Sequence, residues 1–321
     1  MKFILRLCGA ALAVTALVAA IGQASDPAEI LKSFTDLRMQ RMREAREANK
    51  TLDAAALTAE IRAKADEAVK NLDHKTLDPK KGNLWAQVYQ TAGKHKEACD
   101  LCEAFLKTGP SPEEKFAAQM LMLNSCNELG EADMLVMTLG EVSAPGWAAS
   151  QQLARSVAFQ YSDTIAKAKG IDAALKALDD AEKQIRYEAP EDYAKRLFAS
   201  TKARQPKNAD GSPKTDEQIQ ADLLAASKGT NDTVRFTVVG KKADLLSDAG
   251  RKEYAVRLLD EFIGSVDPSS PALRRAKSTR TQLTIVGSAA PELVYGRKHG
   301  EFKSLAEWIG KVVIVDFTAH W

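Results

Sequence analysis

Four glycines divide the middle of this chain into segments whose apolar residues recur at helical spacing. Gly93, Gly130 and Gly170 are 37 and 40 residues apart, and Gly250 ends a further helical segment in "LLSDAGRKEYAVRLLDEF". A helix pair that is apolar on both faces must stack on a neighbour to bury them. The sequence therefore predicts a mainly α protein, with a curved α-solenoid of helical hairpins over residues 25–283.

One of these hairpins is similar to a tetratricopeptide repeat. In "LWAQVYQTAGKHKEACDLCEAFLKTGP", residues Ala86, Tyr89, Gly93, Ala98 and Pro110 fall where that repeat has its small, aromatic, turn, small and terminal positions. The other hairpins match more weakly, and their spacing exceeds the usual period of about 34 residues, so we expect degenerate repeats. The resemblance implies that a concave groove binds a peptide or a protein partner. The alternative is that the helices serve only as a spacer.

Two helices are expected before these hairpins, and one loop is expected to interrupt them. Asp26 followed by Pro27 is a helix start signal, and a second helix should begin near Asp53. The stretch "QPKNADGSPKTDEQ", residues 205–218, is predicted to be a polar loop.

Residues 1–24 have the pattern of a cleaved signal peptide. Lys2 and Arg6 precede an apolar run, and the small residue Ala24 marks cleavage before Ser25. A membrane anchor is the alternative, but the run is short for a span of about 20 residues. We therefore expect a periplasmic or secreted protein with no membrane span after cleavage. The mature chain has balanced charge, which gives no argument for nucleic acid.

Cys99 and Cys102 form a Cys-x-x-Cys pair whose surroundings do not fit a redox site. A thioredoxin-type pair follows a strand and opens a helix, where the helix N-terminus lowers the pKa of the first thiol. This pair is instead expected inside the second helix of a repeat, with no strand before it. We predict buried thiols, or a structural disulfide of Cys126 with Cys102 or Cys99. The histidines are scattered, and no metal site or cofactor is expected.

The composition changes at about residue 284. Gly296 and Gly300 flank a polar turn that predicts a β-hairpin, and "KSLAEWIGK" predicts a short helix. Residues 312–317 are a nearly continuous apolar run, which is typical of a strand buried on both faces.

This last segment resembles the start of a redoxin, specifically a TlpA-like thioredoxin of bacterial envelopes. The resemblance implies that residues 284–321 are the first part of an α/β thioredoxin-like domain and that its redox Cys-x-x-Cys comes directly after Trp321. On that basis the chain is expected to be truncated and to contain no catalytic residue. The matching residues, in order, are Gly287, Ala290, Pro291, Ser304, Leu305, Gly310, Lys311, Asp316, Phe317, Ala319 and Trp321.

Asp316, Phe317, His320 and Trp321 would flank the expected redox site. Two positions depart from the family pattern: Thr318 replaces a common aromatic, and His320 replaces a small hydroxyl residue. Protonated His320 beside a cysteine would favour its thiolate. The alternative is that His320 points into solvent and has no role.

Three functions are consistent with the sequence. The first is an exported thiol:disulfide oxidoreductase whose helical repeats bind the protein partner. The second is a peroxiredoxin-like peroxidase fragment, which Trp321 disfavours because that family lacks a tryptophan directly before its cysteine. The third is a non-enzymatic scaffold of the cell envelope whose repeats bind a partner.

Overall fold

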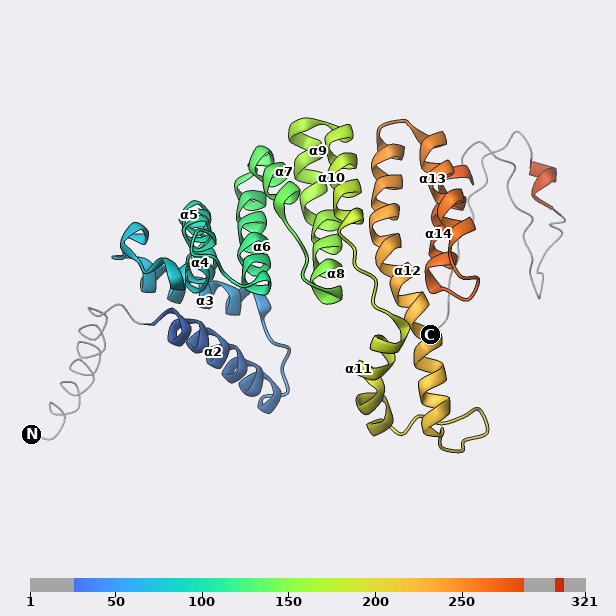
Figure 1. The fold of residues 1–321 in the computed structure, drawn as a ribbon, viewed down its shortest axis with the longest axis horizontal. Helices are drawn as coiled ribbons and strands as arrows, with labels where there is room; N and C mark the ends of the chain where they lie inside the picture. The colour runs from blue at the N-terminus through green and yellow to red at the C-terminus, as the bar shows by residue number, and fades with distance from the viewer. Residues whose placement is uncertain (1–25, 286–303, 309–321) are drawn as a thin grey trace, which may run out of the picture.

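The computed structural model describes residues 26–285 and 304–308. These residues are mainly helical, and consecutive helices pack side by side in a row (Figure 1). The helices are α2 (Pro27–Glu47), α3 (Ala54–Val69), α4 (Gly82–Thr91), α5 (His95–Leu106), α6 (Pro112–Leu129), α7 (Ala132–Glu141), α8 (Trp147–Ser156), α9 (Ser162–Lys169), α10 (Ile171–Lys183), α11 (Pro190–Ala203), α12 (Asp216–Asp248), α13 (Lys252–Ser265) and α14 (Pro271–Ile285). Shorter helical turns are η2 (His74–Thr76), η3 (Pro79–Lys81), the π-helical η4 (Val157–Tyr161) and η5 (Leu305–Trp308).

The four glycines of the sequence pattern lie at the turns between paired helices, as predicted. Gly93 separates α4 from α5, Gly130 separates α6 from α7, Gly170 separates α9 from α10, and Gly250 separates α12 from α13. All four have a positive φ, between 71° and 88°. This is the left-handed region that side chains rarely adopt, so glycine is the residue that lets the chain reverse there.

The first two helices begin where the capping signals place them. The Asp26 carboxylate accepts a hydrogen bond from the Ala28 amide at 3.2 Å, and Pro27 is the first residue of α2. The Asp53 carboxylate accepts from the Ala56 amide at 2.9 Å, and α3 follows. Each cap satisfies an amide that the helix leaves without a partner.

The buried apolar residues form successive clusters along the row of helices. One cluster joins α2 to α6, a central cluster extends from α5 to α12, and a third joins α12, α13 and α14. Each helix thus buries its apolar faces against its neighbours, as a stacked array requires. Lys242 of α12 adds a polar link, because its buried ammonium lies 2.5 Å from carboxylate oxygens of both Asp179 and Glu182 on α10.

One helical hairpin projects from this array. Helix α11, the loop after it and the first part of α12, through Leu224, extend away from the row (Figure 1). We call this hairpin the arm. Its own small core consists of Ala194, Ile219 and Leu223.

The predicted loop at 205–218 is largely confirmed, but it ends before residue 218. Helix α12 begins at Asp216, because Thr215 and Gln218 form a capping box in which each side chain bonds to the other residue's backbone amide. The loop also closes on itself through an isolated bridge between Lys207 and Pro213. It connects the two helices of the arm, so the interruption of the stack is a folded hairpin.

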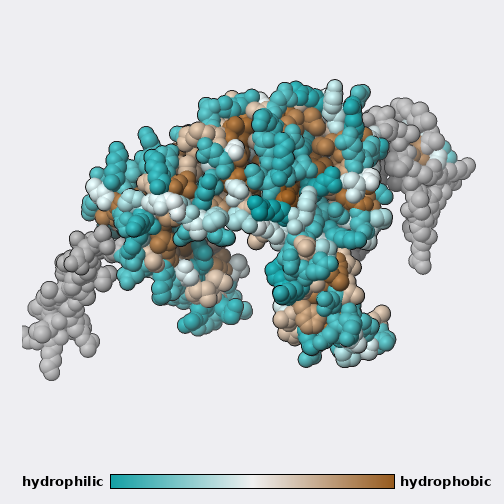
Figure 2. Space-filling view, in the orientation of Figure 1, coloured by the Kyte–Doolittle hydropathy of each residue, from teal (hydrophilic) through white to brown (hydrophobic). Residues whose placement is uncertain are grey.

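The array and its projections together form an arch. Helix α2 lies below one end and the arm lies below the other, so that a hollow opens between them (Figure 2). The surface on this side is mostly hydrophilic, with apolar areas on the arm. No helix within residues 26–285 or 304–308 combines the length and apolar character needed to cross a bilayer.

Several predicted elements lie outside the described residues. These are the signal peptide at 1–24, the β-hairpin around Gly296 and Gly300, and the strand at 312–317. The described part of "KSLAEWIGK" is a single 3-10 turn, Leu305–Trp308, inside the predicted short helix. The mainly α character is therefore confirmed, and the α/β part remains a prediction.

Candidate binding surface

Two clefts of the described residues lie along helix α12. It is 33 residues long, and its two parts have different neighbours. The first part packs on α11 in the arm, and the remainder packs on α8, α10, α13 and α14. The middle of α12 is therefore the place where the arm meets the array.

A groove runs along one face of this middle section. Its floor is made of small residues of α12, including Ala226, Gly229 and Thr230, and its rim includes Arg155 of α8. We call it the α12 groove, and it encloses about 460 Å³. A Cβ atom on Gly229 would lie 3.0 Å from the Pro271 ring, so glycine allows the turn before α14 to close one side of the groove.

A second cleft of about 500 Å³ lies along a different face of α12. Tyr187, which is half exposed, lines it together with Lys228 and Arg235 and with Asp232 and Asp267. One carboxylate oxygen of Asp232 is buried and has no hydrogen-bond partner among the described residues. Burial raises the pKa of the Tyr187 hydroxyl. This cleft therefore offers an aromatic side chain and charges of both signs.

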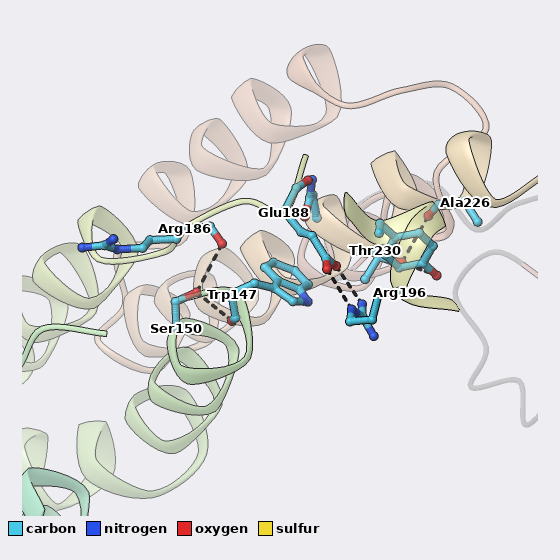
Figure 3. Close-up of polar contacts among 9 residues, drawn as sticks. Trp147, Ser150, Arg186, Glu188, Arg196, Ala226 and Thr230 are labelled. Carbon is cyan, nitrogen blue, oxygen red and sulfur yellow. Dashed lines mark hydrogen bonds and ion pairs between the residues drawn. The ribbon is translucent and has the colours of Figure 1, made fainter. Parts of the chain in front are cut away.

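The connector between α10 and α11 is held to α8 and α12 by side-chain hydrogen bonds (Figure 3). The Ser150 hydroxyl lies 2.9 Å from the Trp147 carbonyl oxygen of its own helix and 3.3 Å from that of Arg186 in the connector. The Asn231 amide donates to the Glu188 carbonyl oxygen at 3.1 Å. These bonds fasten the segment that leads into the arm.

The arm itself is fixed by an ion pair and a hydroxyl contact. Arg196 donates two hydrogen bonds to the Glu188 carboxylate, at 2.8 and 2.7 Å, and Figure 3 shows the two groups facing each other. The Thr230 hydroxyl lies 3.4 Å from the Tyr193 hydroxyl oxygen. A forked arginine pair restricts geometry as well as adding energy, so the arm has a defined position beside the groove.

The three cysteines of the array are buried free thiols. The sulfur atoms of Cys99 and Cys126 are 3.9 Å apart, whereas Cys102 belongs to the neighbouring apolar cluster. Burial raises the pKa of the Cys102 thiol to about 12. Contact with Cys126 and burial also raise the pKa of the Cys99 thiol. Neither thiol of the Cys-x-x-Cys pair is therefore activated as a nucleophile.

The other predicted site residues lie outside the described residues. These are Ala24 and Ser25 at the signal cleavage site, and Asp316, Phe317, His320 and Trp321 beside the expected redox site. Within residues 26–285 and 304–308, no three His, Cys, Asp or Glu side chains lie together in a group that could hold a metal ion.

Sequence reasoning missed the residues of the α12 groove and of the second cleft. The run "AASKGT" at 225–230 places several small residues together within a helical segment. Such a run indicates that another backbone packs closely on the helix there, or that the helix surface is shallow. Its neighbours Arg155 and Pro271 are distant in the sequence, and no local pattern connects them with it.

No protein-family model matches the chain, and no curated protein matches it. The function must therefore be inferred from its own residues and their geometry. The described geometry offers clefts suited to binding.

Proposed function

We propose that this chain is the partner-binding part of an exported thiol:disulfide oxidoreductase of the thioredoxin type. The observation that carries the proposal is the ordered set of eleven residues from Gly287 to Trp321 that resembles the start of a TlpA-like redoxin. In this proposal a degenerate TPR-like α-solenoid binds a protein partner, and the redox domain that begins near residue 284 acts on the partner's disulfides.

The arch supports the binding half of the proposal. The hollow between α2 and the arm is of the kind that stacked helical arrays use to hold an extended segment. The α12 groove lies beside the arm, and the half-exposed Tyr187 lies in the neighbouring cleft. Tyrosine is enriched where proteins bind one another, because it offers a large apolar surface and a polar tip.

The buried cysteines support assigning the redox step to the C-terminal domain. A thiol acts as a nucleophile in its thiolate form, and Cys102 has a pKa of about 12. The reactive pair would instead be the one that the resemblance places after Trp321. Its first thiolate attacks one sulfur of the partner disulfide and releases the other as a thiol, and the second cysteine then resolves the mixed disulfide. The partner gains two electrons, and the enzyme's dithiol becomes a disulfide.

A non-enzymatic scaffold is the second candidate, and one observation favours it. Every feature of the described residues that suggests function is a cleft or groove, and all three array cysteines are buried. Binding of a partner without thiol turnover would support this candidate.

The test uses the whole protein purified from the cell envelope, with insulin as a disulfide substrate and dithiothreitol as the electron source. We expect turnover that is lost when the cysteine following Trp321 is replaced by serine. The matched control is the Cys99→Ser, Cys102→Ser double variant, which should keep its activity. Loss of activity in the control alone would overturn the assignment, and no turnover in any form would favour the scaffold.

A second arm of the experiment tests the α12 groove. Ala226 is exposed on the groove floor, so Ala226→Trp should fill the groove without disturbing the core. We expect KM for insulin to rise several-fold while turnover of a small disulfide, oxidised glutathione, stays unchanged. Ala221→Trp, also exposed on α12 but outside the groove, is the control. Equal effects of the two tryptophans would remove the groove from the proposal.

A further inference from the structure

A smaller cleft at the opposite end of the array has a different character. It lies where α2, α3 and the turn before α5 meet, and it encloses about 290 Å³. Arg38 comes from α2, Arg62 comes from α3, and Gly93 and His95 come from the turn and the first residue of α5. We call it the Arg62 cleft. No carboxylate is among its lining residues.

The two guanidinium groups of this cleft are unpaired within the described part of the chain. Arg38 and Arg62 form no hydrogen bond and no ion pair with any residue that the structure describes. Arg41, one turn after Arg38 on α2, is by contrast bound to both Glu44 and Glu60. Asp66, one turn after Arg62 on α3, is paired with Lys94 at 3.2 Å. Both guanidinium groups are therefore available to bind an anion.

The start of α5 adds uncommitted hydrogen-bond donors at the same place. Lys94 occupies the cap position, and no side chain caps this 12-residue helix. The first backbone amides of a helix have no partner inside the helix, and the helix dipole is positive at this end. The Arg62 guanidinium packs directly on Gly93, where any Cβ atom would collide with it. A glycine at 93 thus brings this guanidinium close to the uncapped helix start.

The half-buried His95 adds a polar atom to the same cleft. Its Nδ1 atom is buried and has no hydrogen-bond partner in the described residues. Buried polar atoms in folded proteins are nearly always paired, and an unpaired one carries a cost. A bound group that accepts or donates at this nitrogen would remove that cost.

We propose that the Arg62 cleft binds a small oxyanion of the phosphate type, either free phosphate or a phosphoryl group on a larger molecule. Guanidinium groups match the oxygen geometry of phosphate with forked donors, and helix N-termini bind such anions through their amides. Two guanidinium groups and the amides supply more donors than the two oxygens of one carboxylate can use.

The test measures binding to the full chain by isothermal titration calorimetry with inorganic phosphate, O-phosphoserine and acetate. We expect saturable binding of the first two and at least tenfold weaker binding of acetate. Arg38→Gln and Arg62→Gln should each weaken phosphate binding at least tenfold. Arg43→Gln is the matched control, because Arg43 is exposed on α2, forms no ion pair in the described residues and does not line the cleft.

The relative affinities of phosphate and O-phosphoserine identify the source of the anion, and tighter binding of the ester would indicate a phosphorylated ligand. Equal weakening by Arg43→Gln would show general surface attraction and overturn the proposal. Acetate binding as tight as phosphate binding, or no saturable binding, would also overturn it. All three arginines are exposed, so the folded state should survive each change. Ala226→Trp should leave phosphate binding unchanged, which separates this proposal from the partner-binding one.

Discussion

The array and the arm are built from the same kind of helical hairpin, but they differ in how much core holds them. The central cluster of the array buries apolar residues from every helix between α5 and α10 and from α12. The arm has three buried residues in its own cluster and packs on only one side. A hairpin within the array is thus stabilised by two neighbours, whereas the arm depends on the junction at the middle of α12. We expect the arm to open locally at a lower free energy than the array.

The largest expected effect comes from the array. Ile165→Ala removes a fully buried side chain from the central cluster and should lower the free energy of unfolding by about 2–5 kcal/mol. Urea denaturation followed by circular dichroism measures this loss. A change below about 1 kcal/mol would contradict the tight packing of the cluster.

The same substitution in the arm should have a smaller and local effect. Ile219 is 2% exposed, and Ile219→Ala should cost about 2 kcal/mol, mostly in opening of the arm. Hydrogen exchange should speed up in α11 and the first part of α12 and stay unchanged in α4–α6. If exchange rises equally throughout the array, the two regions unfold as one unit and the comparison fails.

A third prediction compares a turn glycine with a glycine inside α12. Gly130 has φ 71° with open space around it, so Gly130→Ala should destabilise by about 1 kcal/mol through backbone strain alone. Gly240 is inside α12, and an added Cβ would contact only the Phe236 ring at 3.5 Å. Gly240→Ala should therefore stabilise by about 0.5–1 kcal/mol. Thermal unfolding of both variants measures the two changes in stability. Changes of the same sign would contradict this account.

The smallest expected effect is at the junction. Glu188→Gln removes the charge from the forked pair with Arg196, whose side chain is half exposed, and should cost under about 1 kcal/mol. Hydrogen exchange of α11 should rise slightly, by less than in Ile219→Ala. Unchanged exchange in α11 would mean that the ion pair does not hold the arm.

The turns of the array were predictable because each depends on one residue and its immediate neighbours. Gly93, Gly130, Gly170 and Gly250 separate paired helices, and Asp26 begins α2. The continuous α12 was not predicted, although its start at Thr215 has a capping-box signature. Gly229 and Gly240 lie within it, and glycine alone does not distinguish a turn from a close contact.

The clefts could not be predicted, because they depend on contacts between distant segments. Arg38, Arg62 and His95 span 57 residues and come together only when α2 crosses beside α3 and the start of α5. The Cys99–Cys126 contact was anticipated as one of two pairings, because adjacent repeats place α5 beside α6. The choice between Cys99 and Cys102 depends on which face of α5 turns towards α6.

The π-helical turn Val157–Tyr161 changes which face of a long helical segment packs against its neighbours. With α8 and α9 it forms a continuous helical segment, from Trp147 to Lys169. One extra residue in a turn rotates everything after it by about 100°, since a helix has 3.6 residues per turn. Residues before the turn can therefore keep α12 as their neighbour while residues after it face α7. The turn therefore sets which face of α9 meets α7, and deleting the exposed Gln160 would rotate α9 by about 100° relative to α8.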